Sequence, residues 1–417
     1  MGSREVTMIQ LAPVRQSVSE QQVGNVSAAV WNGLNAVALS ERVRPGMRVA
    51  VAVGSRGISR YREVVQAVVE SLQALGAEPF LVPAMGSHGG GTAEGQHAVL
   101  VGYGMADLGV PIHSSLEVTQ IGDAGGMPIY WDRHAAGADA VIPVNRVKAH
   151  TAFRADHESG LCKIMTIGLG KKKGAATLHA HDAVTAIPRA AQVVLKEMPV
   201  VAGVAIVENG RHETAEIAVV AGERILDEEP ALLRKAKALQ PSIPFDDLDL
   251  LIVQEMGKNI SGTGMDTNVI GMWRRNGGPR EPDFRVLAVL DLTAGSHGNA
   301  SGVGLADLIP ERLRAKIDWH ATYTNCLTAG SFAAAKQPAV LPSDREVIET
   351  GLMGKAAESA RVVWIQNTLE LETLWLSPAL LEEASDIPTL TQVGAAQALQ
   401  FTEKGALQSP VTESIAS

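Results

Sequence analysis

The densest group of reactive side chains lies between residues 150 and 181. Lys163 stands there between Cys162 and Ile164, and apolar neighbours of this kind keep water from an amine. Loss of water lowers the pKa of a lysine and makes its neutral, nucleophilic form available. The same stretch holds four histidines, which are His150, His157, His179 and His181. Their spacing is not that of a four-ligand zinc site.

Other polar residues of this stretch have simpler interpretations. We expect His157 and His181 to face solvent. The lysine run Lys171–Lys173 is expected to form a solvated face, or one that attracts phosphate.

A further histidine, His88, lies within the glycine-rich run Gly86–Gly91. An imidazole between glycines is poorly placed to pack in a core, and it titrates near neutrality, as a general base should. The backbone N–H groups of Gly86, Ser87 and Gly89 precede a predicted helix and are candidates to hold a phosphate. The run matches neither a P-loop nor the Rossmann spacing, so an ordinary turn is the alternative.

Arg56 lies between Gly54 and Gly57 and is a candidate to bind a carboxylate through two parallel hydrogen bonds. A surface arginine on a loop is the alternative. In the C-terminal half, Lys258 follows another predicted strand. Asn299 and Asn325 end two polar segments that would suit a substrate with several hydroxyl groups, and turn formation or helix capping is their alternative.

Strands that alternate with amphipathic helices must position these residues. The strands are expected at Arg48–Val53, Glu78–Pro83, Ala138–Val147 and Val200–Val207, and the helices at Tyr61–Leu75 and from about Thr92. This alternation predicts a mostly parallel α/β sheet, whose ligands bind beyond the carboxyl ends of the strands. The reactive residues follow those ends.

The proline-bearing stretch Gln240–Asp247 is a predicted domain boundary. We expect a catalytic, cofactor-binding α/β domain over residues 1–240, a second α/β domain over 247–400 and a frayed tail over 401–417. In the second domain we expect strands at Leu248–Val253, Arg285–Leu292 and Arg361–Ile365, and a helix near Leu305–Ile317. An active-site cleft between two α/β lobes is the simplest architecture.

Composition excludes several classes of protein. The net charge is −9 without long runs of one sign and aromatic residues make up 4%, so nucleic-acid binding is not expected. We expect no signal peptide, because the first residues lack a charged start followed by an apolar run, and no membrane span, because no apolar run of the chain is long enough. Its two cysteines, Cys162 and Cys326, suit a reducing compartment. We therefore expect a cytoplasmic enzyme with no membrane partner; the oligomeric state is left open.

With these residues assembled, the chain resembles the lactate racemase family, whose members use a nickel-pincer nucleotide. The resemblance runs from about Val49 to Asn268. It rests on the order and spacing of five runs, which are VGSRG, AMGSHGG, VNRVKAH, SGLCKIMTIGLG and TLHAH.

The resemblance implies roles for individual residues. His88 and His150 match the two acid/base histidines. Lys163 matches the lysine that in some members joins the cofactor covalently, and His179 matches the protein ligand of nickel. Arg56 matches the substrate-binding arginine, and Lys258 matches a second cationic contact. The implied cofactor is nickel pyridinium-3,5-bisthiocarboxylic acid mononucleotide, loaded by separate biosynthetic enzymes.

The implied reaction inverts C2 of a 2-hydroxy acid by hydride transfer through a 2-keto acid. Val53 stands three residues before Arg56, where lactate racemases tend to have aspartate, and this favours a substrate larger than lactate. Two alternatives stay open: a nicotinamide-dependent 2-hydroxy acid oxidoreductase and a non-catalytic nucleotide- or nickel-binding homologue.

Overall fold

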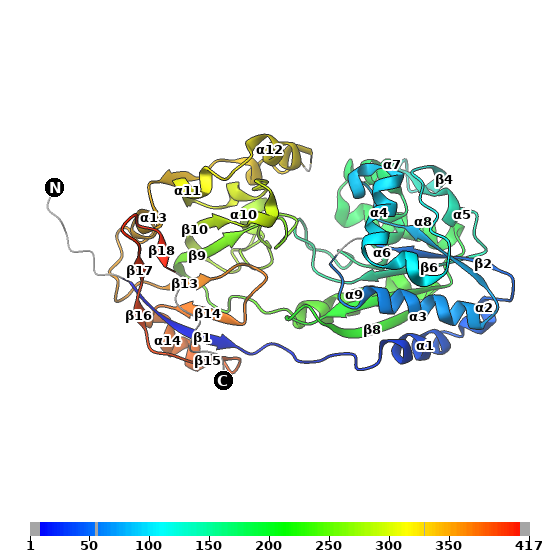
Figure 1. The fold of residues 1–417 in the computed structure, drawn as a ribbon, viewed down its shortest axis with the longest axis horizontal. Helices are drawn as coiled ribbons and strands as arrows, with labels where there is room; N and C mark the ends of the chain where they lie inside the picture. The colour runs from blue at the N-terminus through cyan, green and yellow to red at the C-terminus, as the bar shows by residue number, and fades with distance from the viewer. Residues whose placement is uncertain (1–8, 55–56, 329, 409–417) are drawn as a thin grey trace. The chain divides into compact units, whose positions relative to one another are not determined.

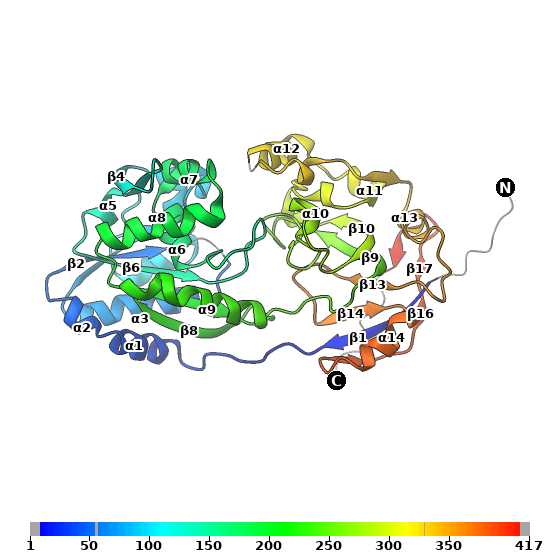
Figure 2. The ribbon, with the colours of Figure 1, turned by 180° about the vertical axis from the view of Figure 1, so that it is seen from behind.

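The computed structural model describes residues 9–54, 57–328 and 330–408. The chain forms two compact units. One comprises residues 19–240, and the other joins the segment before residue 19 to the residues from Pro241 on (Figures 1 and 2). The N-terminal strand therefore belongs with the C-terminal residues and not, as expected, with residues 19–240.

The unit of residues 19–240 contains a five-stranded sheet in the order β3-β2-β6-β7-β8. The first four strands are parallel and β8 is antiparallel to β7. The sheet strands are β2 (Arg48–Val53), β3 (Glu78–Pro83), β6 (Ala140–Arg146), β7 (Ala202–Glu208) and β8 (Thr214–Ala221). A separate antiparallel hairpin consists of β4 (Val118–Asp123) and β5 (Pro128–Asp132).

Helices cover both faces of this sheet because apolar residues occupy both sides of its strands. Along β2, Val49, Val51 and Val53 pack with helices α1 and α3, whereas Ala50 and Ala52 pack with α6, α8 and α9. The helices of this unit are α1 (Val26–Ala36), α2 (Leu39–Arg42), α3 (Tyr61–Ala74), α4 (Ala93–Gly102), α5 (Arg133–Ala136), α6 (Leu161–Lys163), α7 (Lys171–His179), α8 (Ala183–Glu197) and α9 (Ile225–Ala238). A π-helical turn, η3 (Ile164–Gly168), joins α6 to α7.

The other unit is built on a larger mixed sheet. Its strands run β12-β11-β10-β9-β13-β14-β1-β15, and those from β12 to β13 are parallel. They are β1 (Gln10–Gln16), β9 (Leu248–Met256), β10 (Phe284–Leu292), β11 (Leu308–Pro310), β12 (Ala339–Leu341), β13 (Val362–Ile365), β14 (Thr373–Leu376) and β15 (Leu390–Gln392), and β16 (Gln397–Ala398) pairs with β1. The helices are α10 (Trp273–Asn276), α11 (Glu311–Arg314), α12 (Trp319–Thr328), α13 (Asp344–Gly351) and α14 (Pro378–Ser385).

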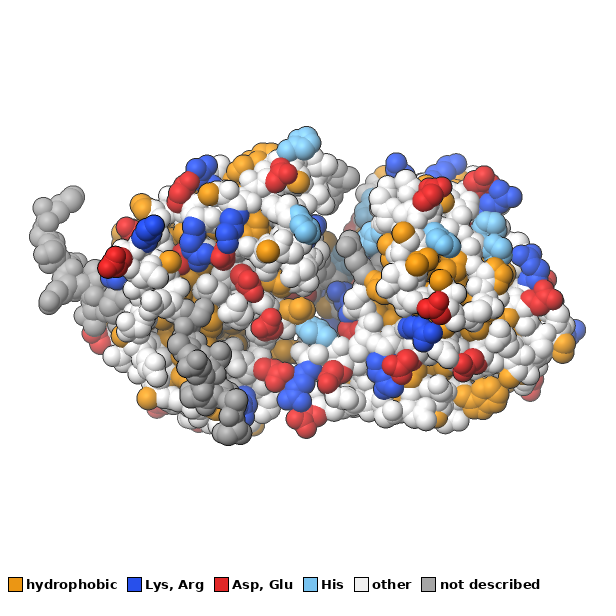
Figure 3. Space-filling model, viewed as in Figure 1, with side chains coloured by type: hydrophobic (Ala, Val, Ile, Leu, Met, Phe, Trp, Pro, Cys, Tyr) orange, Lys and Arg blue, Asp and Glu red, His pale blue; other side chains and the backbone are white. Residues whose placement is uncertain are grey.

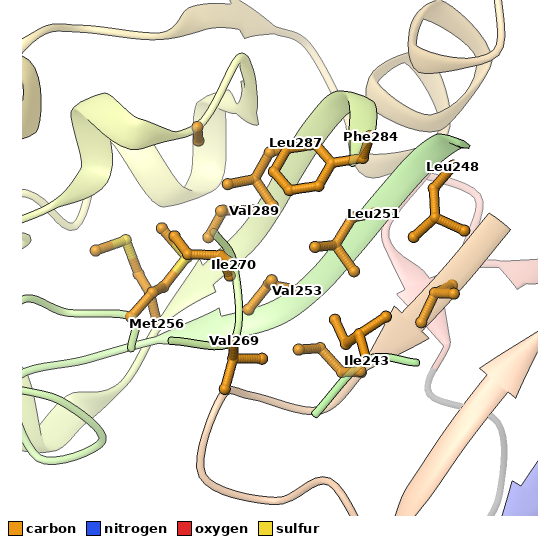
Figure 4. Close-up of a cluster of buried hydrophobic side chains, with 14 of the residues drawn as sticks. Ile243, Leu248, Leu251, Val253, Met256, Val269, Ile270, Phe284, Leu287 and Val289 are labelled. Carbon is orange, nitrogen blue, oxygen red and sulfur yellow. The ribbon is translucent and has the colours of Figure 1, made fainter. Parts of the chain in front are cut away.

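Alternate residues of these strands also point to opposite cores. Leu251 and Val253 of β9 meet Leu287 and Val289 of β10 in one buried cluster (Figure 4). The neighbouring residues Leu250 and Ile252 pack on the other face with Val347 and Ile348 of α13. Continuous apolar strands are typical of sheets covered on both faces.

Two expectations for this unit were wrong. The predicted helix over Leu305–Ile317 contains strand β11, and only its later part is helical, as α11. The predicted frayed tail is ordered as far as residue 408, where β17 (Gln400–Phe401) pairs with β18 (Leu407–Gln408).

The surface carries charges of both signs. Acidic and basic side chains are interspersed on the face shown in Figure 3. Among the described residues, no helix is both long enough and apolar enough to cross a bilayer.

Candidate functional site

Loops at the carboxyl edge of one parallel sheet carry the predicted histidine pair. His88 follows β3, and His150 follows β6. Because β2 lies between β3 and β6, these loops flank the loop after β2, which contains Arg56 in sequence. Arg56 itself lies outside the described residues. The strand order reverses at β2 and β6, which is where open α/β sheets bind ligands.

The loop that carries His88 is held close to its neighbours by glycines. His88 and Ser87 are exposed. Gly86 has a φ of +62°, and a Cβ added there would lie 3.2 Å from the carbonyl oxygen of Ile167. A Cβ on Gly89 would lie 2.7 Å from the backbone nitrogen of Gln96. Close backbone packing thus accounts for both glycines, and a phosphate-binding role for Gly86, Ser87 and Gly89 stays a prediction.

A backbone hydrogen bond joins the His88 loop to the segment after Lys163. The Gly86 N–H donates to the carbonyl oxygen of Gly168, the last residue of η3, at 3.0 Å. The start of the same segment is fixed to β6, since the Asn145 side-chain amide donates to the carbonyl oxygen of Gly160 at 2.9 Å. The elements that carry His88, His150 and Lys163 are therefore directly connected.

His150 is partly buried and firmly placed. Its backbone N–H donates to Glu158 Oε2 at 2.6 Å, and its ring stacks on Phe153 with centroids 4.3 Å apart. Its Nδ1 accepts the Ala152 N–H at 3.1 Å. A neutral imidazole that accepts at Nδ1 carries its hydrogen on Nε2. His150 can therefore accept a proton at Nε2 only after the Ala152 hydrogen bond opens.

The sequence did not indicate the role of Glu158. This carboxylate is almost fully buried, and besides His150 it accepts the Ala155 N–H at 3.1 Å. It also forms an ion pair with Lys237 of α9 at 2.6 Å. Glu158 holds the loop after β6 in place. The sequence did not predict this role, because its partner Lys237 lies far away along the chain.

Lys163 and His179 are close enough for the charge of Lys163 to affect the pKa of His179. Desolvation and the nearby positive charge of Lys148 lower the pKa of Lys163 to about 8. Desolvation and the charge of Lys163 lower the pKa of His179, although this residue is exposed. Both effects favour a neutral amine and a neutral imidazole, which are the forms needed for nucleophilic attack and for metal ligation.

These two residues fit the cofactor that the resemblance implies. Within the described ranges, no group of three or more His, Cys, Asp or Glu side chains is arranged to hold a metal ion by itself. A nickel ion that arrives already bound in a pincer nucleotide needs fewer protein ligands, and the His179 imidazole together with Lys163, whose pKa is lowered, would meet that need.

The remaining predicted contacts belong to the other unit and make local bonds. Lys258 donates from Nζ to the carbonyl oxygen of Gly262 at 2.7 Å. Asn299 accepts the Ser301 N–H at 3.1 Å, as in a turn. Asn325 lies inside α12 and donates to the carbonyl oxygen of Ala321, one turn earlier, at 3.0 Å. The hydrogen bond of Asn299 is therefore that of a turn, and the hydrogen bond of Asn325 lies within a helix.

Two further expectations were wrong. His157 does not simply face solvent, because it is partly buried and its Nε2 lies 2.9 Å from the carbonyl oxygen of Leu226. Lys171 is not part of a solvated face, since its side chain is fully buried beside Asp132. His181 is exposed, as expected.

Comparisons with known proteins bear on this site. Residues 3–192 match the family described as lactate racemase N-terminal domain. The fold is similar to that of the lactate racemase apoprotein from Thermoanaerobacterium thermosaccharolyticum, with a TM-score of 0.51, 11% identity and coverage of 89% of this chain and 95% of that one. A structural-genomics protein from Thermotoga maritima matches with a TM-score of 0.45 and 14% identity over 66% of this chain and 72% of that one. No curated protein matches the sequence.

Proposed function

We propose that the chain is a racemase or epimerase of a 2-hydroxy acid, because its residues 3–192 match the lactate racemase N-terminal domain family. The observation that carries the proposal is the placement of His88 and His150. They follow two strands of one parallel sheet, at the edge where such sheets bind ligands, and their loops flank a third loop that contains Arg56 in sequence.

We propose that Lys163 and His179 hold a nickel-pincer nucleotide, with Lys163 joined to it covalently and His179 as the protein ligand of nickel. Their lowered pKa values support these roles. When bound, this group would supply an acceptor for the hydride of the substrate Cα, so that a 2-keto acid forms and can be reduced again.

The chain's own residues would move the proton and orient the substrate. His88 and His150 exchange a proton with the hydroxyl oxygen of the 2-hydroxy acid, one for each enantiomer. General acid/base assistance of this kind is worth roughly 10²–10⁴ in rate. Arg56 would bind the carboxylate, and rotation of the flat keto group about the bond to that carboxylate would let hydride return to either face.

The substrate is proposed to be larger than lactate, for instance a sugar acid or a dicarboxylate. Val53 is buried at the end of β2 and offers no carboxylate to the pocket. Lys258, Asn299 and Asn325 are proposed as further substrate contacts on the grounds of sequence alone.

The test is an optical assay on enantiomerically pure 2-hydroxy acids, with protein co-produced with the cofactor-building enzymes. We expect the wild type to racemise at least one acid and to prefer it over lactate in kcat/KM. His88→Ala and His150→Ala should each lower racemisation by at least about 100-fold from either enantiomer, because one base can serve only one face. His97→Ala, an exposed histidine of α4, is the matched control and should keep full activity.

Each part of the proposal can fail separately in this assay. Full activity in His88→Ala or in His150→Ala contradicts the two-base pair. Lactate as the best substrate contradicts the assignment of substrate size. A steady requirement for added nicotinamide supports an ordinary oxidoreductase instead.

A further inference from the structure

Lys171 is a fully buried lysine in an unusual backbone conformation. Its side chain has no exposed surface, and its φ of +53° lies in the left-handed region that residues other than glycine rarely adopt. Such a conformation is strained and persists only where the surroundings fix it. The contacts of the buried side chain therefore fix this conformation.

The Lys171 ammonium group joins three elements. It donates to the carbonyl oxygen of Pro83, at the end of β3, and to Gln96 Oε1 of α4 at 3.1 Å. It also lies 3.3 Å from Asp132 Oδ2, at the end of β5, and that carboxylate is fully buried as well. A lysine can only donate hydrogen bonds, so it determines which end of the Gln96 amide faces it.

The other end of the Gln96 amide therefore faces the His88 loop. Gln96 Nε2 donates to the carbonyl oxygen of Gly86 at 2.7 Å and to that of His88 at 3.4 Å. The Gln96 side chain is fully buried. Its amide thus binds the backbone on both sides of Ser87, including the carbonyl group of His88 itself.

We infer that Gln96, oriented by Lys171, is a positioning residue that aims the His88 imidazole. The inference rests on the proposed role of His88. The loop needs such a support because Gly86, Gly89, Gly90 and Gly91 all have positive φ, and glycine restricts the backbone less than any other residue. Carbonyl groups fixed at Gly86 and His88 determine the direction in which the His88 side chain leaves the loop.

The first test uses hydrogen exchange in the apoprotein and needs no activity. Gln96→Glu keeps the size of the side chain and offers Lys171 an anionic partner, but it has no donor for the two carbonyl groups. Gln96→Met removes both functions without changing the shape much. Gln16→Met is the matched control, because Gln16 is also a buried glutamine that donates to one carbonyl, that of Leu371, in the other unit.

In both Gln96 variants we expect the amides of residues 86–92 to exchange about tenfold faster or more than in the wild type, which corresponds to the loss of one or two hydrogen bonds. In Gln16→Met these amides should exchange at the wild-type rate. Wild-type exchange of this segment in Gln96→Glu would overturn the inference that Gln96 anchors the loop.

The second test separates positioning from general stability. With loaded enzyme, Gln96→Glu should lower kcat by about tenfold or more and leave KM within about twofold, because substrate binding does not use Gln96. Nickel content should stay at the wild-type value. Faster exchange together with unchanged kcat would overturn the positioning role. If the wild type racemises no acid, the proposed function fails, and the exchange test still decides whether Gln96 anchors the loop.

Discussion

The two candidate bases are restrained in opposite ways. His88 is exposed on a loop whose backbone is held from below by Gln96. His150 is partly buried, stacked on Phe153 and bonded at Nδ1 to the Ala152 N–H. The Ala152 hydrogen bond of His150 must therefore open before its Nε2 can accept a proton. This asymmetry leads us to expect unequal rates for the two enantiomers in partial reactions.

His179→Ala should abolish nickel retention in protein co-produced with the cofactor-building enzymes. The imidazole of His179 is the proposed protein ligand of the metal, and its lowered pKa keeps it in the ligating form at neutral pH. Metal analysis of the purified protein measures the effect. His181→Ala, an exposed histidine two residues later, should retain nickel. Full nickel occupancy in His179→Ala would show that the ligand assignment is wrong.

Arg56→Lys should raise KM by about tenfold for the best substrate and change kcat less. Lysine keeps the positive charge but loses the planar pair of donors that binds a carboxylate through two hydrogen bonds. Steady-state kinetics over a range of substrate concentrations give both constants. A variant with the wild-type KM and kcat would exclude Arg56 as the carboxylate-binding residue.

At the scale of elements, a run of short helical elements, interrupted at Lys171 by a left-handed backbone, presents the proposed cofactor residues. Lys163 ends α6, the π-helical turn η3 follows, and His179 ends α7. Short π-helical turns within α-helices are frequent at functional sites. At the start of this segment the carboxylate of Glu229, from α9, accepts the Cys162 N–H at 2.8 Å. Glu229 therefore fixes the helix end that precedes Lys163.

Glu229→Gln should change how stability depends on pH. Burial raises the pKa of Glu229 despite the Leu161 and Cys162 N–H groups and the nearby His157, so the folded state binds this proton more tightly than the unfolded state. Stability of the wild type then falls as pH rises from the ordinary carboxyl pKa through the raised one. Glutamine has no such proton, so the variant should gain stability relative to the wild type between about pH 5 and pH 8.

Urea unfolding at those two pH values measures the difference, and Glu94→Gln, an exposed position on α4, is the control. A constant difference between Glu229→Gln and the wild type at both pH values would contradict a raised pKa.

Local patterns predicted the strands and helices that present the site. The valines of β2 and the helical spacing of Val64, Val65 and Val68 in α3 are strong signals for a strand and a helix. They are strong because these side chains are all buried. Strand β11 was missed because Leu308–Pro310 is too short to show a period. Its residues were instead included in the helix predicted over Leu305–Ile317.

Long-range contacts were not predictable in the same way. Strand β1 pairs with β14, more than 300 residues later, and no local signal indicates that partner. Lys171 has the sequence context of a solvated lysine run, and only its distant contacts with Pro83, Gln96 and Asp132 bury it. The histidines and Lys163 were identifiable because the glycine and apolar residues beside them are local. Their supports, Gln96 and Glu158, were not.

At the scale of the whole molecule, the central claim is that one parallel sheet brings two bases to a substrate whose Cα hydrogen travels as hydride. A two-base mechanism through a carbanion would use the same histidines but would release that hydrogen as a proton to solvent. The two mechanisms therefore differ in the fate of one atom.

The most direct measurement follows a Cα-deuterated 2-hydroxy acid through early turnover in ordinary water, with loaded enzyme and the best substrate from the panel. Mass spectrometry of the product enantiomer gives the deuterium content. The account predicts that the label is retained while the configuration inverts. Loss of deuterium at the rate of racemisation would contradict it.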